Sequence, residues 1–250
     1  MATQEGILKI KGTIGGMTFY KSKDGHLVRE KGGVDGSRIA SDPAFARTRE
    51  NGQEFGNGGT SGKYLRDAVR NMMLNASDNR VVSRLVQVLM SIQKLDTVSE
   101  RGLRTVEQGL STAEGKAMLN GFDFNINAVF GSIFFKSFGL DPLTGTVNID
   151  NLIPLADILA PSGATHFSLK SGFAVIDFNS GVSALNVSDE IIAALDNTTQ
   201  NVSLAPIGGA PAGSGIKVHL LLISFYQQVN GFNYSLKSGA YNALTIIGVA

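Results

Sequence analysis

The opening stretch Ile7–Lys31 constrains the fold most, because its pattern predicts strands that lack an interior of their own. Three short strands are expected at Ile7–Lys11, Met17–Lys21 and His26–Lys31. They are separated by a glycine pair and by Asp24-Gly25, a strong two-residue hairpin signal. A ribbon of two or three strands is only marginally stable in water. Its apolar side chains must therefore be buried against the rest of the chain or against a second copy.

This ribbon defines a candidate self-assembly interface, since clustered apolar side chains left on a surface mark interaction sites. The residues expected to form the interface are Leu8, Ile10, Met17, Phe19, Tyr20, Leu27 and Val28. Whether the covering surface belongs to the same chain or to another copy stays open at the level of sequence.

Helical signals follow the ribbon. A connector is expected over residues 32–43, and Asp42-Pro43 is a helix-start signal for a short helix over residues 44–55. The glycine-rich run 56–62 is expected to end that helix. A second helix is predicted over residues 61–75 and a third, strongly amphipathic one over residues 79–95. The short turn between these two predicts an antiparallel helical hairpin.

Residues 96–121 predict short helices, because capping boxes occur there among several glycines. From Phe122 onward the spacing changes to the alternation of strands separated by Gly, Pro or Asn turns. One short apolar helix, Glu190–Leu195, is expected to interrupt them. The predicted strands are Phe122–Asn127, Ala128–Phe135, Thr146–Ile149, Ala164–Lys170, Ala174–Phe178, Asn201–Leu204, Ile216–Gln228, Phe232–Lys237 and Tyr241–Val249.

The predicted fold class is therefore α+β. An N-terminal β-ribbon arm and a helical hairpin are followed by an antiparallel β-sandwich-like domain. The expected division is residues 1–41 for the arm and connector, 42–120 for the helical region and 121–250 for the sandwich-like domain.

The composition and motifs limit the kinds of functional site that this chain can contain. The chain has no Cys, which excludes disulfides and thiolate metal sites. Gly56–Lys63 resembles a phosphate-binding loop but lacks its first Gly and its final Ser or Thr. The three histidines are scattered without ligand spacing. We therefore predict no catalytic, cofactor-binding or metal-binding residues and no cofactor.

No apolar run approaches the ~18 residues of a membrane span and no signal peptide precedes the ribbon, so we expect cytoplasmic synthesis.

Charge is distributed unevenly along the chain. Residues 1–119 hold 18 Lys and Arg against 13 Asp and Glu, whereas residues 120–250 hold 4 against 8. Opposite charge can favour head-to-tail contact between copies. Interleaved acidic residues dilute the attraction of the first part for phosphates. The candidate nucleic-acid contacts are Lys9, Lys11, Lys21, Lys23, Arg29 and Lys31.

The sequence from Lys9 to Lys31, followed by Arg38–Pro43 and Arg47–Gly56, resembles a family of uncharacterised bacterial proteins of about this length. Proteins of this kind are met in phage-like and mobile-element settings. The likeness extends through Val81–Arg84 and Gly121–Asn127 to the end of the chain. It implies a structural or assembly role and carries over no catalytic residues.

The leading hypothesis is a non-enzymatic structural subunit that self-assembles into a virion component or a filament through its N-terminal strands. Its expected partners are other copies of itself and, in a virion, other virion proteins. One alternative is a nucleic-acid-associated protein that uses the basic N-terminal region. A second alternative is a carbohydrate-binding β-sandwich, in which Tyr226, Phe232 or Tyr241 would stack on sugars.

Overall fold

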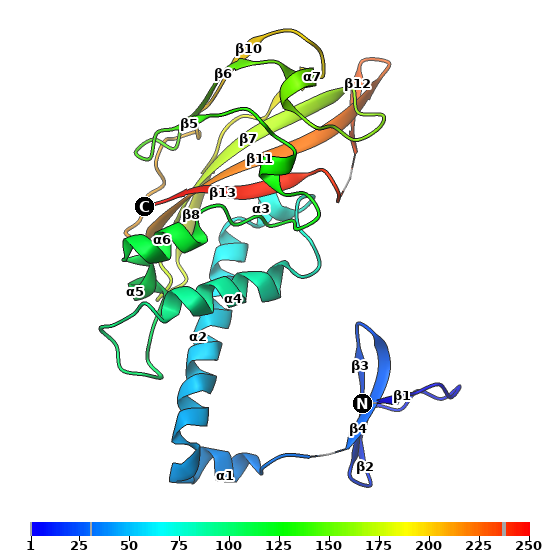
Figure 1. Cartoon of the computed structure of the whole chain (residues 1–250), viewed down its shortest axis with the longest axis vertical. Helices are drawn as coiled ribbons and strands as arrows, with labels where there is room; N and C mark the ends of the chain where they lie inside the picture. Colours follow the sequence, from blue (N-terminus) through cyan, green and yellow to red (C-terminus); the bar gives the residue numbers. More distant parts are fainter. Residues whose placement is uncertain (1, 31, 237–238) are drawn as a thin grey trace. The chain divides into compact units, whose positions relative to one another are not determined.

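The computed structural model describes residues 2–30, 32–236 and 239–250. The chain divides after Arg49 into two compact units, and the larger one runs from Glu50 to Ala250 (Figure 1). Helices and several antiparallel sheets together form an α+β fold with a sandwich-like β domain, as the sequence predicts. The expected boundary at residue 120 falls inside the larger unit, because the helices there share a hydrophobic core with the sheet.

The first unit is built on a four-stranded antiparallel sheet with the strand order β1-β4-β3-β2. Its elements are β1 (Ala2–Thr3), β2 (Gly12–Ile14), β3 (Met17–Ser22), β4 (Gly25–Glu30), α1 (Gly36–Ser41) and the 3-10 turn η1 (Pro43–Phe45). Gly15 and Gly16, with φ of 56° and 81°, form the turn between β2 and β3. A hairpin forms where the sequence predicts one, but Ser22 pairs with Gly25, so the two turn residues are Lys23 and Asp24 rather than Asp24 and Gly25.

Two predictions for this unit are wrong. Ile7–Lys11 is not a strand: the side-chain amide of Gln4 replaces a neighbouring strand, accepting a hydrogen bond from Ile10 N at 3.0 Å and donating one to Ile10 O at 3.3 Å. The expected connector contains α1, because the Asp35 carboxylate caps a helix by accepting from Ser37 N at 2.8 Å.

Helix α2 (Ala46–Ala68) runs without a break through the glycine-rich run that was expected to separate two helices. That expectation treated glycine only as a helix breaker. Packing outweighs the propensity, because a Cβ at Gly58 would lie 2.9 Å from Met90 Sδ and one at Gly62 would lie 3.3 Å from a Val86 methyl. These glycines allow α2 to approach α4 (Val81–Gln93) closely, and Figure 1 shows the two helices crossing.

Three shorter helices complete the helical region. They are α3 (Arg70–Met73), α5 (Val106–Leu110) and α6 (Ala113–Leu119). Thr105 caps α5 and Thr112 caps α6 through their side-chain oxygens. The expected short helices ending near Asn120 are therefore present.

The larger unit contains a six-stranded antiparallel sheet centred on the long pair β7 (His166–Ile176) and β11 (Ile216–Val229). A three-stranded sheet with the order β10-β6-β5 packs on one face, and the helices cover part of the other face (Figure 1). The other elements are η2 (Phe130–Ser132), β5 (Gly139–Leu140), β6 (Val147–Leu152), α7 (Pro154–Asp157), β8 (Ser183–Val187), β9 (Ile191–Ala194), β10 (Gln200–Leu204), β12 (Phe232–Leu236) and β13 (Ala243–Val249).

Several strand assignments require correction. Residues 122–135 form no strand. Phe122 and Phe124 are nevertheless buried, and two isolated bridges join Asp123 to Thr245 and Phe134 to Ile158. Glu190–Leu195 forms no helix, because Ile191–Ala194 pairs with β7 as β9, and tertiary pairing overrides local propensity. The two strands expected on either side of residues 171–173 are one continuous strand, β7.

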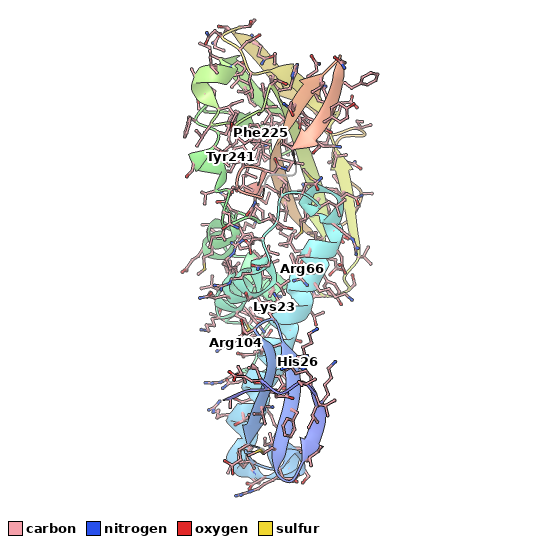
Figure 2. All side chains as sticks on the ribbon, turned by 90° about the vertical axis from the view of Figure 1, so that its right-hand side faces the viewer. Lys23, His26, Arg66, Arg104, Phe225 and Tyr241 are labelled. Carbon is pink, nitrogen blue, oxygen red and sulfur yellow. The ribbon has the colours of Figure 1, made fainter. Side chains whose placement is uncertain are left out.

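The central strands of the six-stranded sheet contribute to a hydrophobic core on each face, because successive residues of a strand point to opposite sides. Leu220 belongs to the core shared with the helices, and Leu221 belongs to the core shared with the small sheet. In the second core the Phe225 and Tyr241 rings meet edge to face, with their centroids 6.3 Å apart, and both residues are labelled in Figure 2. The long central strands are therefore held from both sides.

Matched glycine substitutions test this packing. A Cβ at Gly109 would overlap the backbone oxygen of Ile92, so Gly109→Ala should lower the free energy of unfolding by about 1–3 kcal/mol. A Cβ at Gly56 would meet nothing within 4 Å, and this residue is exposed inside α2. Gly56→Ala should therefore raise the free energy of unfolding by about 0.5–1 kcal/mol. Urea unfolding followed by circular dichroism measures the free energy of unfolding of both variants. Equal changes in the two variants would contradict the packing described here for Gly109.

A pH-dependent prediction concerns Asp96, which is almost fully buried between α4 and α5. Burial raises the pKa of its carboxyl, but hydrogen bonds from the Ser99, Thr105 and Val98 amides outweigh that effect and the net pKa is lowered. Its stabilisation is therefore present above the unfolded pKa of about 3.9 and is lost as pH falls through the folded pKa.

Asp96→Asn should cost about 1–3 kcal/mol at pH 7, because a buried hydrogen-bonded charge is removed. Urea midpoints of the wild type and the variant should converge as the pH falls below about 4. A difference that stays constant down to pH 3 would contradict this role of the Asp96 carboxylate.

Candidate functional site

The N-terminal sheet has no interior. None of residues 2–30 and 32–49 is buried, and all of them are exposed or half-buried. Folded sheets normally cover at least one face with a second layer. The first unit therefore presents strands whose apolar side chains remain accessible.

Strand register sorts these side chains into two faces. Directly opposed residues on antiparallel strands share a face. Phe19 pairs with Val28, and Met17 pairs with Ile14, so these four residues lie together on one face, called here the apolar face. Ile14 is 60% exposed and Met17 is 50% exposed.

The other predicted interface residues lie elsewhere. Tyr20 and Leu27 pair with each other on the opposite face. Leu8 and Ile10 are exposed in the segment between β1 and β2, outside any strand. The structure therefore brings Met17, Phe19 and Val28 together. It adds Ile14, which the sequence reasoning missed although its position across the glycine turn from Met17 indicates the pairing.

Charged residues flank the apolar face at both ends. Glu30 pairs with Met17 at one end, and Lys21 pairs with His26 at the other. Partial burial and the neighbouring ammonium groups of Lys21, Lys9 and Lys11 lower the pKa of His26. This face is therefore acidic at one end, apolar in the middle and basic at the other end.

The candidate nucleic-acid residues do not form a single surface. Lys9 donates a hydrogen bond to the backbone oxygen of Gln4. Arg29 lies on the face opposite Lys21, with its guanidinium carbon 5.6 Å from the centre of the Tyr20 ring. Lys23 lies in the hairpin loop next to His26, at the same end of the sheet (Figure 2). Lys31 lies outside the described residues.

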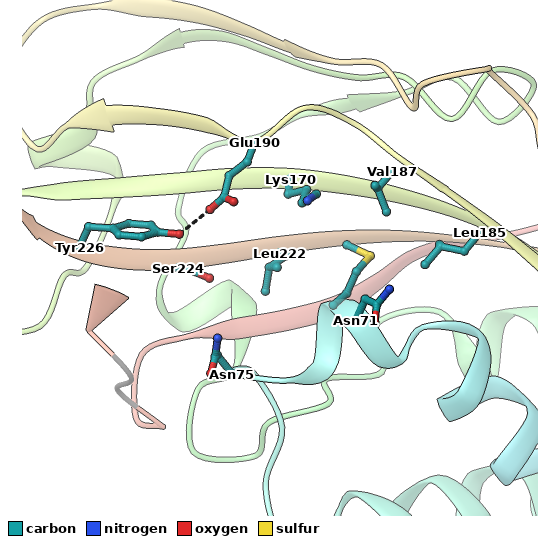
Figure 3. Close-up of a pocket in the computed structure, with 10 residues that line it drawn as sticks. Asn71, Asn75, Lys170, Leu185, Val187, Glu190, Leu222, Ser224 and Tyr226 are labelled. Carbon is teal, nitrogen blue, oxygen red and sulfur yellow. Dashed lines mark hydrogen bonds between the residues drawn. The ribbon is translucent and has the colours of Figure 1, made fainter. Parts of the chain in front are cut away.

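The larger unit contains a cavity of about 300 Å³ where helix α3 meets the six-stranded sheet (Figure 3). The Tyr226 hydroxyl donates to Glu190 Oε1 at 2.6 Å. Burial and the carboxylate of Glu190 raise the pKa of Tyr226 to about 12, because both disfavour the charged phenolate. Lys170 also lines the cavity. Sequence reasoning named Tyr226 only as an exposed aromatic residue.

The other aromatic residues named for sugar stacking lie in different surroundings. Phe232 is 70% exposed on β12, whereas Tyr241 packs against Phe225 in the second core. Within the described ranges, no group of three or more His, Asp or Glu side chains is placed to hold a metal ion. No helix in the same ranges is long and apolar enough to cross a bilayer.

Comparison with known proteins supplies no relative: no family model, no curated protein and no solved structure matches this chain.

Proposed function

We propose that this protein is a non-enzymatic structural subunit that self-associates through the apolar face of its N-terminal sheet. The observation that carries the proposal is a four-stranded sheet in which no described residue is buried. The larger unit has two hydrophobic cores of its own and does not require the sheet for an interior. The N-terminal sheet is therefore the part whose stability most needs a second copy.

The free energy of burying apolar side chains favours association with a second copy of this chain. Fully burying a side chain of the size of Ile14, Met17, Phe19 or Val28 contributes about 1.5–3 kcal/mol. Four such residues from each copy can exceed an association cost that begins at roughly 4 kcal/mol. Two sheets stacked face to face supply the missing second layer of a sandwich.

Charge complementarity favours one orientation. A two-fold axis in the interface, perpendicular to the strands, reverses the strand direction of the second copy. Glu30 of each copy then faces Lys21 and His26 of the other, while the apolar centres meet. Parallel stacking would instead place like charges opposite each other.

Extension beyond a dimer requires a second contact. Among the strands that the structure describes, β1 and β2 each have one edge without a neighbouring strand, and an exposed sheet edge accepts a strand from another chain. Face and edge contacts used together generate a repeated assembly. The resemblance to proteins of phage-like settings supports a virion component or a filament as that assembly.

Two single substitutions on β3 test the face. Phe19→Asp places a charge within the apolar face and should weaken self-association at least about tenfold, because burying an unpaired carboxylate is costly. Thr18→Asp adds the same charge on the opposite face of the same strand and should have little effect. Sedimentation velocity across a concentration series measures both, and equal behaviour of the two variants would contradict the proposed interface.

A charge exchange tests the orientation. Lys21→Glu and Glu30→Lys should each weaken association by about two- to fivefold, as expected for exposed ion pairs at low salt. The double variant should recover much of the loss, because the acidic and basic ends are then simply exchanged. Additive loss in the double variant, measured by the same sedimentation series, would rule out the antiparallel pairing.

A second candidate function rests on the basic end of the N-terminal sheet, where Lys21 pairs with His26 and the charges of Lys9 and Lys11 also act on that imidazole. Such a basic cluster would bind nucleic-acid phosphates with an affinity that falls steeply with salt. Replacing both Lys9 and Lys11 with Gln should then reduce the slope of log affinity against log salt by about 2. Lys63→Gln, at an exposed lysine of α2, is the control. Absence of DNA retention at low salt would eliminate this candidate.

A further inference from the structure

The helices leave part of the six-stranded sheet uncovered. A Cβ at Gly172 would lie 2.5 Å from Met72 Sδ, so this glycine allows α3 to rest directly on β7. Beyond that contact the same face continues through Lys170 on β7 and through Ser224 and Tyr226 on β11. The cavity of about 300 Å³ lies at this point, where α3 ends and the sheet continues.

The uncovered face is unusually polar for a sheet whose opposite face lies in the core. Lys170 pairs with Leu222, and the next pairs on this face are Ser168 with Ser224 and His166 with Tyr226. The intervening residues of β7, Phe167 and Leu169, point into the second core. Ser168 and Ser224 on this face are already buried, whereas Lys170 and Tyr226 are half-buried. A further layer over this face would bury the Lys170 ammonium group, which is unfavourable without a partner.

The polar groups converge on the cavity from separate elements. Tyr226 directs its hydroxyl to Glu190, as Figure 3 shows, and Asn71 and Asn75 approach from the α3 side. A carboxylate has two oxygens, so Glu190 can accept another hydrogen bond besides the one from Tyr226. In the part of the chain that the structure describes, Lys170 forms no ion pair.

We propose that this cavity binds a small hydroxylated carboxylate of monosaccharide size, such as an acidic sugar. The Lys170 ammonium pairs with the ligand carboxylate, and Glu190, Asn71 and Asn75 bind ligand hydroxyls. Leu222 and Val187 supply apolar surface for the C–H face of the ring. A cavity of about 300 Å³ is at the small end of ligand sites, which fits one sugar ring. All the residues that line the cavity belong to the larger unit, so ligand binding can be tested separately from self-association.

Equilibrium dialysis of the full chain with radiolabelled D-glucuronate tests the site, with D-glucose as the neutral probe of similar size. We expect saturable glucuronate binding that is at least about tenfold tighter than glucose binding, because a charge-assisted pair is formed only with the acid. Absence of saturable glucuronate binding at millimolar concentrations would overturn the proposal.

Substitutions of Lys170 test whether glucuronate binds in this cavity. Lys170→Met should weaken glucuronate binding about tenfold and bring it close to glucose binding, whereas Lys170→Arg should retain most of it. Lys63→Met removes the same charge from the exposed surface of α2 and should change nothing. Equal binding by Lys170→Met and Lys63→Met would overturn the site.

Should Lys170→Met fail to fold, as judged by circular dichroism, the wild type still provides the test. Glucuronate binding should then weaken as salt rises while glucose binding stays constant. An equal response of the two sugars would refute the ammonium–carboxylate pair.

Discussion

The larger unit depends on the pairing of β7 with β11. Eleven consecutive residue pairs run from Ile216–Ile176 to Tyr226–His166 without a register shift. Because side chains alternate along a strand, one ladder supplies apolar residues to two cores at once. The helices bury one core and the small sheet β10-β6-β5 buries the other. The sheet is stable because its central strands bury apolar side chains on both faces.

The N-terminal sheet also needs a layer that buries its apolar side chains, but its own unit does not supply one. Its four strands pair as regularly as those of the larger sheet, yet residues 2–30 and 32–49 supply no second layer that converts the apolar face into a core. Hydrogen bonding between strands adds little net stability without such burial, so a small sheet normally acquires a covering layer. The proposed self-association follows from this requirement: a second copy provides the layer that residues 2–49 do not provide for themselves.

Close backbone approach determines where the larger sheet is covered and where it stays open. Gly58 and Gly62 bring α2 onto α4, and Gly172 brings α3 onto β7. Past Gly172 the face carries Lys170 and Tyr226, which are only half-buried and whose polar groups are costly to bury. The part of β7 that α3 covers and the part that lines the cavity are therefore adjacent. Gly172 lies under α3, and Lys170, two residues away on the same strand, lines the cavity.

Local chemistry in the sequence determined the α+β class, the hairpin between β3 and β4, the amphipathic helix α4 and most strands after residue 146, because period and turn residues act over a few positions. Only tertiary structure decided that glycines continue α2 and that Ile191–Ala194 is a strand. These outcomes depend on contacts between distant segments: Gly58 with Met90, and β9 with β7. The cavity at Tyr226 and Glu190 likewise exists only after α3 meets the sheet, so no spacing along the chain could indicate it.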